Sequence, residues 1–187
     1  RWVQDCNYAQ CVEVEIDSAH VSFLHSLVNN NVAQKTALAG SYFSGDRAPK
    51  WKVIDTDWGM TLGARRVTEE DRYYWRMNQW YMPFYTMIAP VPGEARSFRM
   101  WVPSDDTHTS IICVSYRSEK PVGDAEVEGW QRGVNQHAER IPGTLIPVRN
   151  GSNEYLIGRE KQRTETFSGI ECVRAQDAAM VESAGPI

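Results

Sequence analysis

Six short runs rich in β-branched and aromatic residues occupy the middle of this chain. They are WKVIDTD (51–57), GMTLGARRV (59–67), RYYWRMNQW (72–80), FYTMIA (84–89), SFRMWV (97–102) and TSIICVSY (109–116). Turn-forming sequences separate them, among them TEED (68–71), PVPGE (90–94) and PSDDT (103–107). Strands so closely spaced pair with their neighbours in sequence, so the pattern predicts an antiparallel sheet built as a meander.

Helical sequences flank these runs on both sides. We predict helices over 10–29, 121–139 and 169–183, the last with Ile170, Val173, Ala178 and Val181 roughly at helical spacing. The stretches 29–50 and 141–160 are predicted to be irregular, and the first is long enough to serve as a lid. The predicted fold class is therefore α+β, a curved antiparallel sheet with helices gathered on one side.

Composition limits the classes of function. A chain of 187 residues with 42% hydrophobic residues suits one globular domain, and a formal charge of −4 argues against binding nucleic acid. No apolar run reaches the roughly 20 residues of a membrane span. The four cysteines show no CxxC spacing, which is typical of free thiols in a reducing cytoplasm.

The segment IDSAHVSFLH (16–25) combines Asp17, His20 and His25. Five residues apart, the two histidines would point about 140° from each other on a regular helix, so they can bind one metal only if the helix unwinds between them. Asp17, three residues before His20, could accept its ring N–H and orient it. A third ligand is offered by Asp177, an acid among small and apolar residues. The alternatives are two structural histidines and a helix-surface acid.

Four ordered stretches of the chain resemble one family. They are CNYAQCVEVEIDSAHVSFLH, YYWRMNQWYMPFYTMI, IPGTLIPVRN with NEYLIGREKQRTETFSGI, and QDAAMVESAGPI. The first contains D-x2-H-x4-H, and all four are similar to the catalytic domain of Rieske-type aromatic-ring-hydroxylating oxygenases, in the phthalate 4,5-dioxygenase-like branch.

The resemblance implies a site and a fold. His20, His25 and Asp177 match the triad that binds a mononuclear non-haem iron(II), the metal that activates dioxygen. Asp17 matches the acid that passes electrons to the iron from the Rieske cluster of a neighbouring subunit. The implied fold is a helix-grip fold, a curved sheet around a long C-terminal helix, in a homotrimer supplied by a reductase or ferredoxin.

The family also carries a [2Fe–2S] cluster on C-x-H and C-x2-H pairs, and no cysteine here has that context. We therefore expect residues 1–187 to be the catalytic domain of a longer oxygenase component. Its N-terminal Rieske domain and its extreme C-terminus would lie outside this chain.

An aromatic substrate is expected to bind near the third run. Tyr73, Trp75 and Met77 alternate with more polar residues there, and Trp75 and Trp80 are candidates for an aromatic wall. Arg76 could hold a substrate carboxylate bidentately. Ordinary core packing is the alternative for each aromatic residue, and an internal acid is the alternative partner for Arg76.

Three classes of function remain open on these grounds. The resemblance implies aromatic hydroxylation or oxidative demethylation with electrons from NAD(P)H. A zinc hydrolase would use the same ligands but lacks an HExxH general base. A hydrophobic-ligand-binding module with the same fold would have no use for converging metal ligands.

Overall fold

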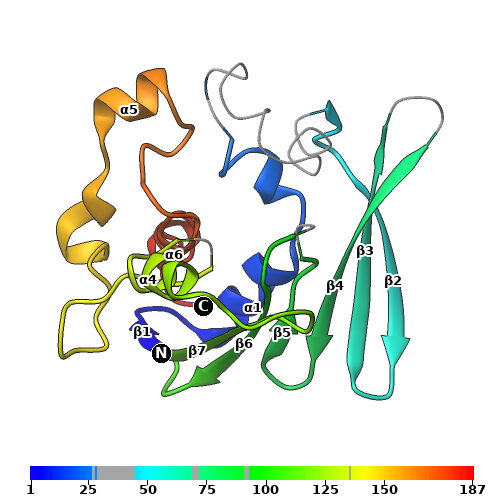
Figure 1. The fold of residues 1–187 in the computed structure, drawn as a ribbon, viewed down its shortest axis with the longest axis horizontal. Helices are drawn as coiled ribbons and strands as arrows, with labels where there is room; N and C mark the ends of the chain where they lie inside the picture. The colour runs from blue at the N-terminus through cyan, green and yellow to red at the C-terminus, as the bar shows by residue number, and fades with distance from the viewer. Residues whose placement is uncertain (27, 29–44, 69–71, 91–92, 135) are drawn as a thin grey trace.

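The computed structural model describes residues 1–26, 28, 45–68, 72–90, 93–134 and 136–187. Most of the stretch suggested as a lid, 29–50, lies outside these residues. One antiparallel sheet of seven strands organises the fold, in the order β1-β7-β6-β5-β4-β3-β2 (Figure 1). Its strands are β1 (Trp2–Gln4), β2 (Lys50–Thr56), β3 (Gly59–Val67), β4 (Tyr73–Tyr81), β5 (Tyr85–Met87), β6 (Arg96–Pro103) and β7 (Thr109–Tyr116).

The predicted meander is confirmed, because β2 to β7 each pair with the next strand in sequence. The short strand β1 joins the far edge by pairing with β7. The two edges of the sheet are therefore β1 and β2. The α+β class predicted from the alternation of runs and turns is confirmed with it.

The helices gather on one side of this sheet (Figure 1). They are α1 (Tyr8–Ile16), α4 (Asp124–Gln131), α5 (Arg159–Thr164) and α6 (Val173–Ser183), with 3₁₀ turns η1 (His20–Ser22) and η2 (Gly151–Leu156). Asn7 caps α1 by accepting from the backbone N–H of Ala9, while Gln10 accepts from the N–H of Asn7. The C-terminal helix is confirmed, but α4 is shorter than the predicted 121–139, since Gly133 has a φ of +82° two residues beyond its end. The stretch predicted to be irregular contains η2 and overlaps α5.

The hydrophobic core lies where α1 and α6 meet the β1 end of the sheet. Its buried members include Trp2, Cys11, Trp101, Ile111 and Val181, so it joins the edge strand β1, its neighbours β7 and β6, and both helices. These shared apolar side chains hold the C-terminal helix against the sheet, which is the helix-grip arrangement.

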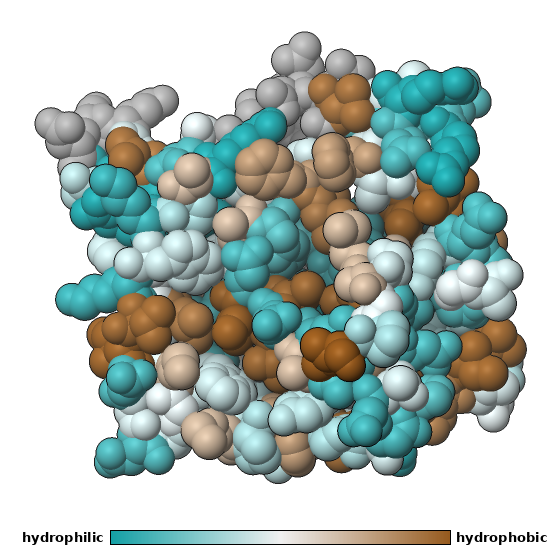
Figure 2. Space-filling view, turned by 180° about the vertical axis from the view of Figure 1, so that it is seen from behind, coloured by the Kyte–Doolittle hydropathy of each residue, from teal (hydrophilic) through white to brown (hydrophobic). Residues whose placement is uncertain are grey.

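The outer regions of the molecule are less apolar. On the face seen in Figure 2, hydrophobic side chains form several separate groups among polar ones. Within the described residues, no helix is long and apolar enough to cross a membrane.

The alternation of side chains across the sheet positions the site. Arg76 and Asn78 on β4 share a face with Arg66 on β3, because Ala64 pairs with Arg76 and Leu62 with Asn78. This is the inner face, on which Asn78 reaches α1 and Arg66 reaches η1. Trp75 and Met77 point to the outer face and are 44% and 42% exposed.

Candidate metal centre

The chain breaks its first helix at Asp17. The backbone of Asp17 is extended, with φ −71° and ψ 122°, and its carboxylate accepts from the N–H groups of Ala19 at 2.9 Å and His20 at 2.8 Å. Asp17 therefore ends α1 and caps the following turn. The prediction of one helix over 10–29 is wrong in this respect. The side-chain hydrogen bonds of Asp17 compete with the backbone bonds that would continue the helix, and they end it. Between His20 and His25 the chain forms the 3₁₀ turn η1 and a further turn rather than a regular helix, which is the unwinding that the two histidines required.

Two inner-face side chains of the sheet hold the broken segment in place. Asn78 donates to the carbonyl of Ile16 at 3.0 Å, at the last residue of α1. Arg66, fully buried, donates to the carbonyl and the hydroxyl of Ser18 and to the hydroxyl of Ser22. These bonds satisfy backbone groups that the helix break exposes. They fix His20 relative to the sheet.

His20, His25 and Asp177 converge, although Asp177 comes from α6, far along the chain. The Oδ1 atom of Asp177 lies 3.5 Å from Nε2 of His20 and 3.1 Å from Nε2 of His25. The two rings meet edge to face, with centroids 5.2 Å apart. One ligand atom from each residue lies within 4.8 Å of the others, which is a geometry that can hold one metal ion.

Hydrogen bonds at the far side of each ring decide which nitrogen faces the centre. Asp17 Oδ2 lies 3.1 Å from Nδ1 of His20. Gln176 Oε1 lies 2.6 Å from Nδ1 of His25, while its amide nitrogen donates to the carbonyl of Ile170. A carboxylate and an amide oxygen only accept, so both Nδ1 atoms carry the proton. When both rings are neutral, as metal binding requires, both Nε2 lone pairs face Asp177.

That arrangement leaves acceptors facing acceptors. Asp177 is 4% exposed, and its Oδ1 receives no hydrogen bond of normal geometry from any described residue. A buried carboxylate oxygen between two imidazole lone pairs calls for a cation. The three residues therefore fit a mononuclear iron site, since two imidazoles and one carboxylate are the donor set of non-haem iron(II) oxygenases.

The electrostatics describe what happens to the same groups without a cation. Burial disfavours a charged ring, but Asp17 and Asp177 outweigh it and raise the pKa of His20 to about 9. Without a metal, His20 is therefore protonated at neutral pH, and a bound cation takes the place of its Nε2 proton. Burial likewise opposes ionisation of Asp177, yet Arg174 and the two histidines hold the pKa of Asp177 well below its usual range. Asp177 is thus an anion at neutral pH, ready to bind a cation.

A cavity of about 220 Å³ opens beside the triad. Its wall includes the three triad residues and Asp17, apolar groups and a few polar ones: Val14, Glu15, Val21, Arg76, Ile88, Glu94, Gln136 and Val173. A cavity of roughly 150 Å³ is enough for benzene, so this one has room for a substituted aromatic ring. Arg76 belongs to the same cavity as the metal ligands, as the substrate prediction requires.

The two tryptophans of that prediction lie elsewhere. Trp75 is on the outer face of β4, against Gly63, and Trp80 packs on the core and donates to the carbonyl of Pro83. Neither is among the residues that line the cavity, because odd and even positions of one strand face opposite ways and Trp80 lies nearer the core end of β4. A role for Trp75 or Trp80 in substrate binding stays a prediction that this geometry does not favour.

Several residues of the site were not foreseen. Gln176 orients His25, and the buried Glu15, Arg99 and Arg174 lie around Asp177. The signal for Gln176 was its place next to Asp177, within QDAAMVES. The signal for the second group was Glu15, a charged residue between the apolar Val14 and Ile16 and two positions before Asp17.

The whole chain, residues 1–187, matches the model of the family described as LigXa C-terminal domain like. The chain belongs to this family. Two curated members of the wider group are 32% identical over 97% of this chain: the oxygenase subunit of 3-chlorobenzoate-3,4-dioxygenase from Comamonas testosteroni and that of phthalate 4,5-dioxygenase from Pseudomonas putida. The oxygenase subunit of tert-butanol monooxygenase / tert-amyl alcohol desaturase from Aquincola tertiaricarbonis is 30% identical over 68% of this chain.

This LigXa C-terminal domain-like chain is thus the catalytic domain of a Rieske aromatic-ring-hydroxylating oxygenase, as its resemblance predicted. It spans 44% and 43% of the length of the first two relatives.

Proposed function

We propose that this domain oxygenates an aromatic carboxylate at an iron(II) ion held by His20, His25 and Asp177. The convergence of these three residues around the orphaned Oδ1 of Asp177 is the observation that carries the proposal. Bound iron(II) supplies the reductive activation of dioxygen. The chain supplies three ligands from one side, which leaves the cavity side open for dioxygen and substrate.

Asp17 is proposed as the entry point for electrons. Its carboxylate contacts His20 through Nδ1, and its side chain is still 37% exposed, so a group outside this chain can approach it. In the proposed assembly that group is the Rieske cluster of a neighbouring subunit in a homotrimer, and electrons come from NAD(P)H through a separate reductase. The cytoplasmic location expected from the sequence stays a prediction.

The proposed substrate class follows from Arg76. A guanidinium in the wall of a partly apolar cavity suits a planar carboxylate, which it can bind through two parallel hydrogen bonds. The names of two relatives, 3-chlorobenzoate and phthalate dioxygenases, are those of enzymes for aromatic carboxylates. Val14, Val21 and Ile88 would contact the ring.

The outcome of the reaction depends on which substrate atom the cavity places nearest the metal. Dihydroxylation, monohydroxylation and oxidative demethylation are compatible with one triad. The relatives themselves include a monooxygenase as well as two dioxygenases.

The substrate class is tested by calorimetric titration of benzoate and phthalate into the protein and its Arg76→Met variant. Loss of a bidentate charged contact should weaken binding by about tenfold or more. Arg65→Met is the matched control, because Arg65 lies on the outer face of β3 and stacks on Tyr73. Unchanged affinity of Arg76→Met for every aromatic carboxylate that binds would refute this role of Arg76.

A further inference from the structure

A chain of buried charges leads away from the metal ligand Asp177. Arg174 Nη2 lies 3.6 Å from Asp177 Oδ2, and Arg174 Nη1 lies 3.5 Å from Oε2 of Glu15. The other oxygen of Glu15 contacts Arg99. The four side chains, Asp177, Arg174, Glu15 and Arg99, are each between 1% and 6% exposed. We call them the buried ion-pair chain.

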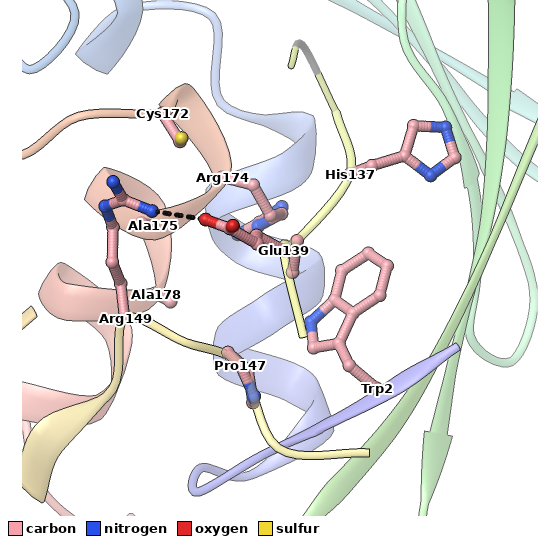
Figure 3. Close-up of a pocket in the computed structure, with 10 residues that line it drawn as sticks. Trp2, His137, Glu139, Pro147, Arg149, Cys172, Arg174, Ala175 and Ala178 are labelled. Atoms are coloured by element: carbon pink, nitrogen blue, oxygen red, sulfur yellow. Dashed lines mark hydrogen bonds and ion pairs between the residues drawn. The ribbon is translucent and has the colours of Figure 1, made fainter. Parts of the chain in front are cut away.

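The buried ion-pair chain is largely shielded from solvent, although Glu15 and Asp177 also border the cavity beside the triad. Trp101, fully buried on β6, has the guanidinium carbons of Arg174 and Arg99 within 5.2 and 6.0 Å of its ring centroid. Figure 3 shows Arg174 between α6 and α1, behind a small cavity that also involves Trp2 and Glu139. At the end of the buried ion-pair chain away from Asp177, Arg99 donates to Oε1 of Gln136, a residue of the substrate cavity wall.

Stability alone is a poor reason for such an arrangement. Buried ion pairs often contribute no more than apolar side chains of the same volume, since desolvation offsets their attraction. The buried ion-pair chain also holds two cations and two anions, so its formal charge is zero before any metal binds. We therefore look to its effect on the orientation of the Asp177 carboxylate.

We propose that Arg174 and Glu15 are positioning residues that hold Asp177 with Oδ1 toward the histidines and Oδ2 away from the metal. This inference rests on the metal site proposed above. Arg174 engages Oδ2, which keeps the carboxylate from turning and favours binding through one oxygen. Glu15 contacts both Arg174 and Arg99, so that only one of the two buried guanidinium charges is left to act on Asp177. Arg99 balances Glu15.

Charge-neutral double variants separate this role from mere packing. Glu15→Gln with Arg99→Met keeps Arg174 on Asp177, whereas Glu15→Gln with Arg174→Met removes it. The metal-free protein and both variants are titrated with cobalt(II) against a competing chelator, and the EPR spectrum of bound cobalt(II) is recorded. Glu13→Gln is the matched control, because Glu13 is an exposed acid on the same helix.

The first double variant should bind cobalt(II) within about threefold of the unmodified protein, with the same spectrum. The second should show a changed spectrum, because Oδ2 is released, and an affinity lower by about tenfold or more. Single Glu15→Gln should also bind at least tenfold more weakly, since it leaves an uncompensated buried cation beside Asp177. Equal affinities and identical spectra for the two double variants would overturn the inference. Failure of the unmodified protein to bind cobalt(II) would instead overturn the metal site on which it rests.

Discussion

At the scale of single residues, the orientation of each histidine depends on one partner. Gln176 is 7% exposed, and it holds His25 by accepting at Nδ1 while donating to the carbonyl of Ile170. Without that acceptor the ring can rotate or change tautomer, and Nε2 no longer points reliably at the metal position.

We therefore predict that Gln176→Leu lowers iron(II) affinity by about 10–100-fold. The variant should keep its near-UV circular dichroism, since leucine nearly fills the same volume. Gln131→Leu, at an exposed position on α4, serves as control. Equal affinity in Gln176→Leu and the control would show that His25 is positioned without Gln176.

His137 gives a second prediction at this scale, independent of the metal. Burial and the charge of Arg99 lower the pKa of His137 from its usual 6.5 to about 4, and its ring lies 2.7 Å from the hydroxyl of Ser115. Between pH 6.5 and 4 the unfolded chain binds the proton and the folded chain does not. Stability that is present above pH 6.5 is therefore lost as the pH falls through this window.

The melting temperature of the unmodified protein should drop by about 2–4 °C more than that of His137→Gln between pH 6.5 and 5, after allowance for the partial exposure of the ring. His108→Gln should differ from the unmodified protein in its pH dependence above pH 6.5 instead, because Asp105 raises the pKa of His108 and the resulting stability is lost as the pH rises. A parallel pH dependence of His137→Gln and the unmodified protein would mean that His137 is not kept neutral by its surroundings.

Residue types and spacing were enough to select His20, His25 and Asp177 as candidates, because few side chains bind metals and D-x2-H-x4-H is a specific pattern. They were not enough for Trp75 and Trp80. Which face of β4 meets the cavity depends on the pairing register with β3, and the alternation of one strand leaves that choice open for Trp75. Trp80 shares the face of Arg76 but packs on the core, which only the tertiary structure shows.

At the scale of elements, the break between α1 and η1 makes the site possible. Strand runs and the final helix could be predicted because their periodicity is local. The end of α1 could not, because it depends on tertiary bonds from Asn78 and Arg66 to the carbonyls of Ile16 and Ser18 as well as on Asp17. Helix propensity in this stretch is mediocre, and tertiary contacts decide it.

Asn78→Leu tests this dependence. It leaves the carbonyl of Ile16 and the N–H of Ala89 without their partner, so we expect a loss of about 1–3 kcal/mol in the free energy of unfolding. Iron(II) affinity should fall with it, because His20 follows directly after the released segment. Gln79→Leu, on the opposite face of β4, is the control, and urea unfolding measures both. A variant with lowered stability but intact metal affinity would show that the break persists without Asn78.

At the scale of the whole molecule, the sheet together with α1 and α6 brings together residues that lie more than 150 positions apart. His25 and Gln176, or Glu15 and Arg174, meet because α6 packs on α1 across a shared core. The order of secondary structure predicted the α+β class, since a meander with flanking helices has few ways to bury one face. The buried ion-pair chain could not be predicted, because a sequence does not say which charged residues a fold buries together.

We propose that this domain holds one iron(II) at His20, His25 and Asp177. The most direct test loads the protein anaerobically with iron(II), removes loosely bound metal and counts iron per chain, beside Asp177→Ala and the exposed-site control Asp57→Ala. We predict about one tightly held iron in the unmodified protein and in Asp57→Ala, with loss or great weakening in Asp177→Ala. A folded protein that retains no iron, or an Asp177→Ala variant that retains as much as the unmodified protein, would contradict the account and favour a ligand-binding domain without catalysis.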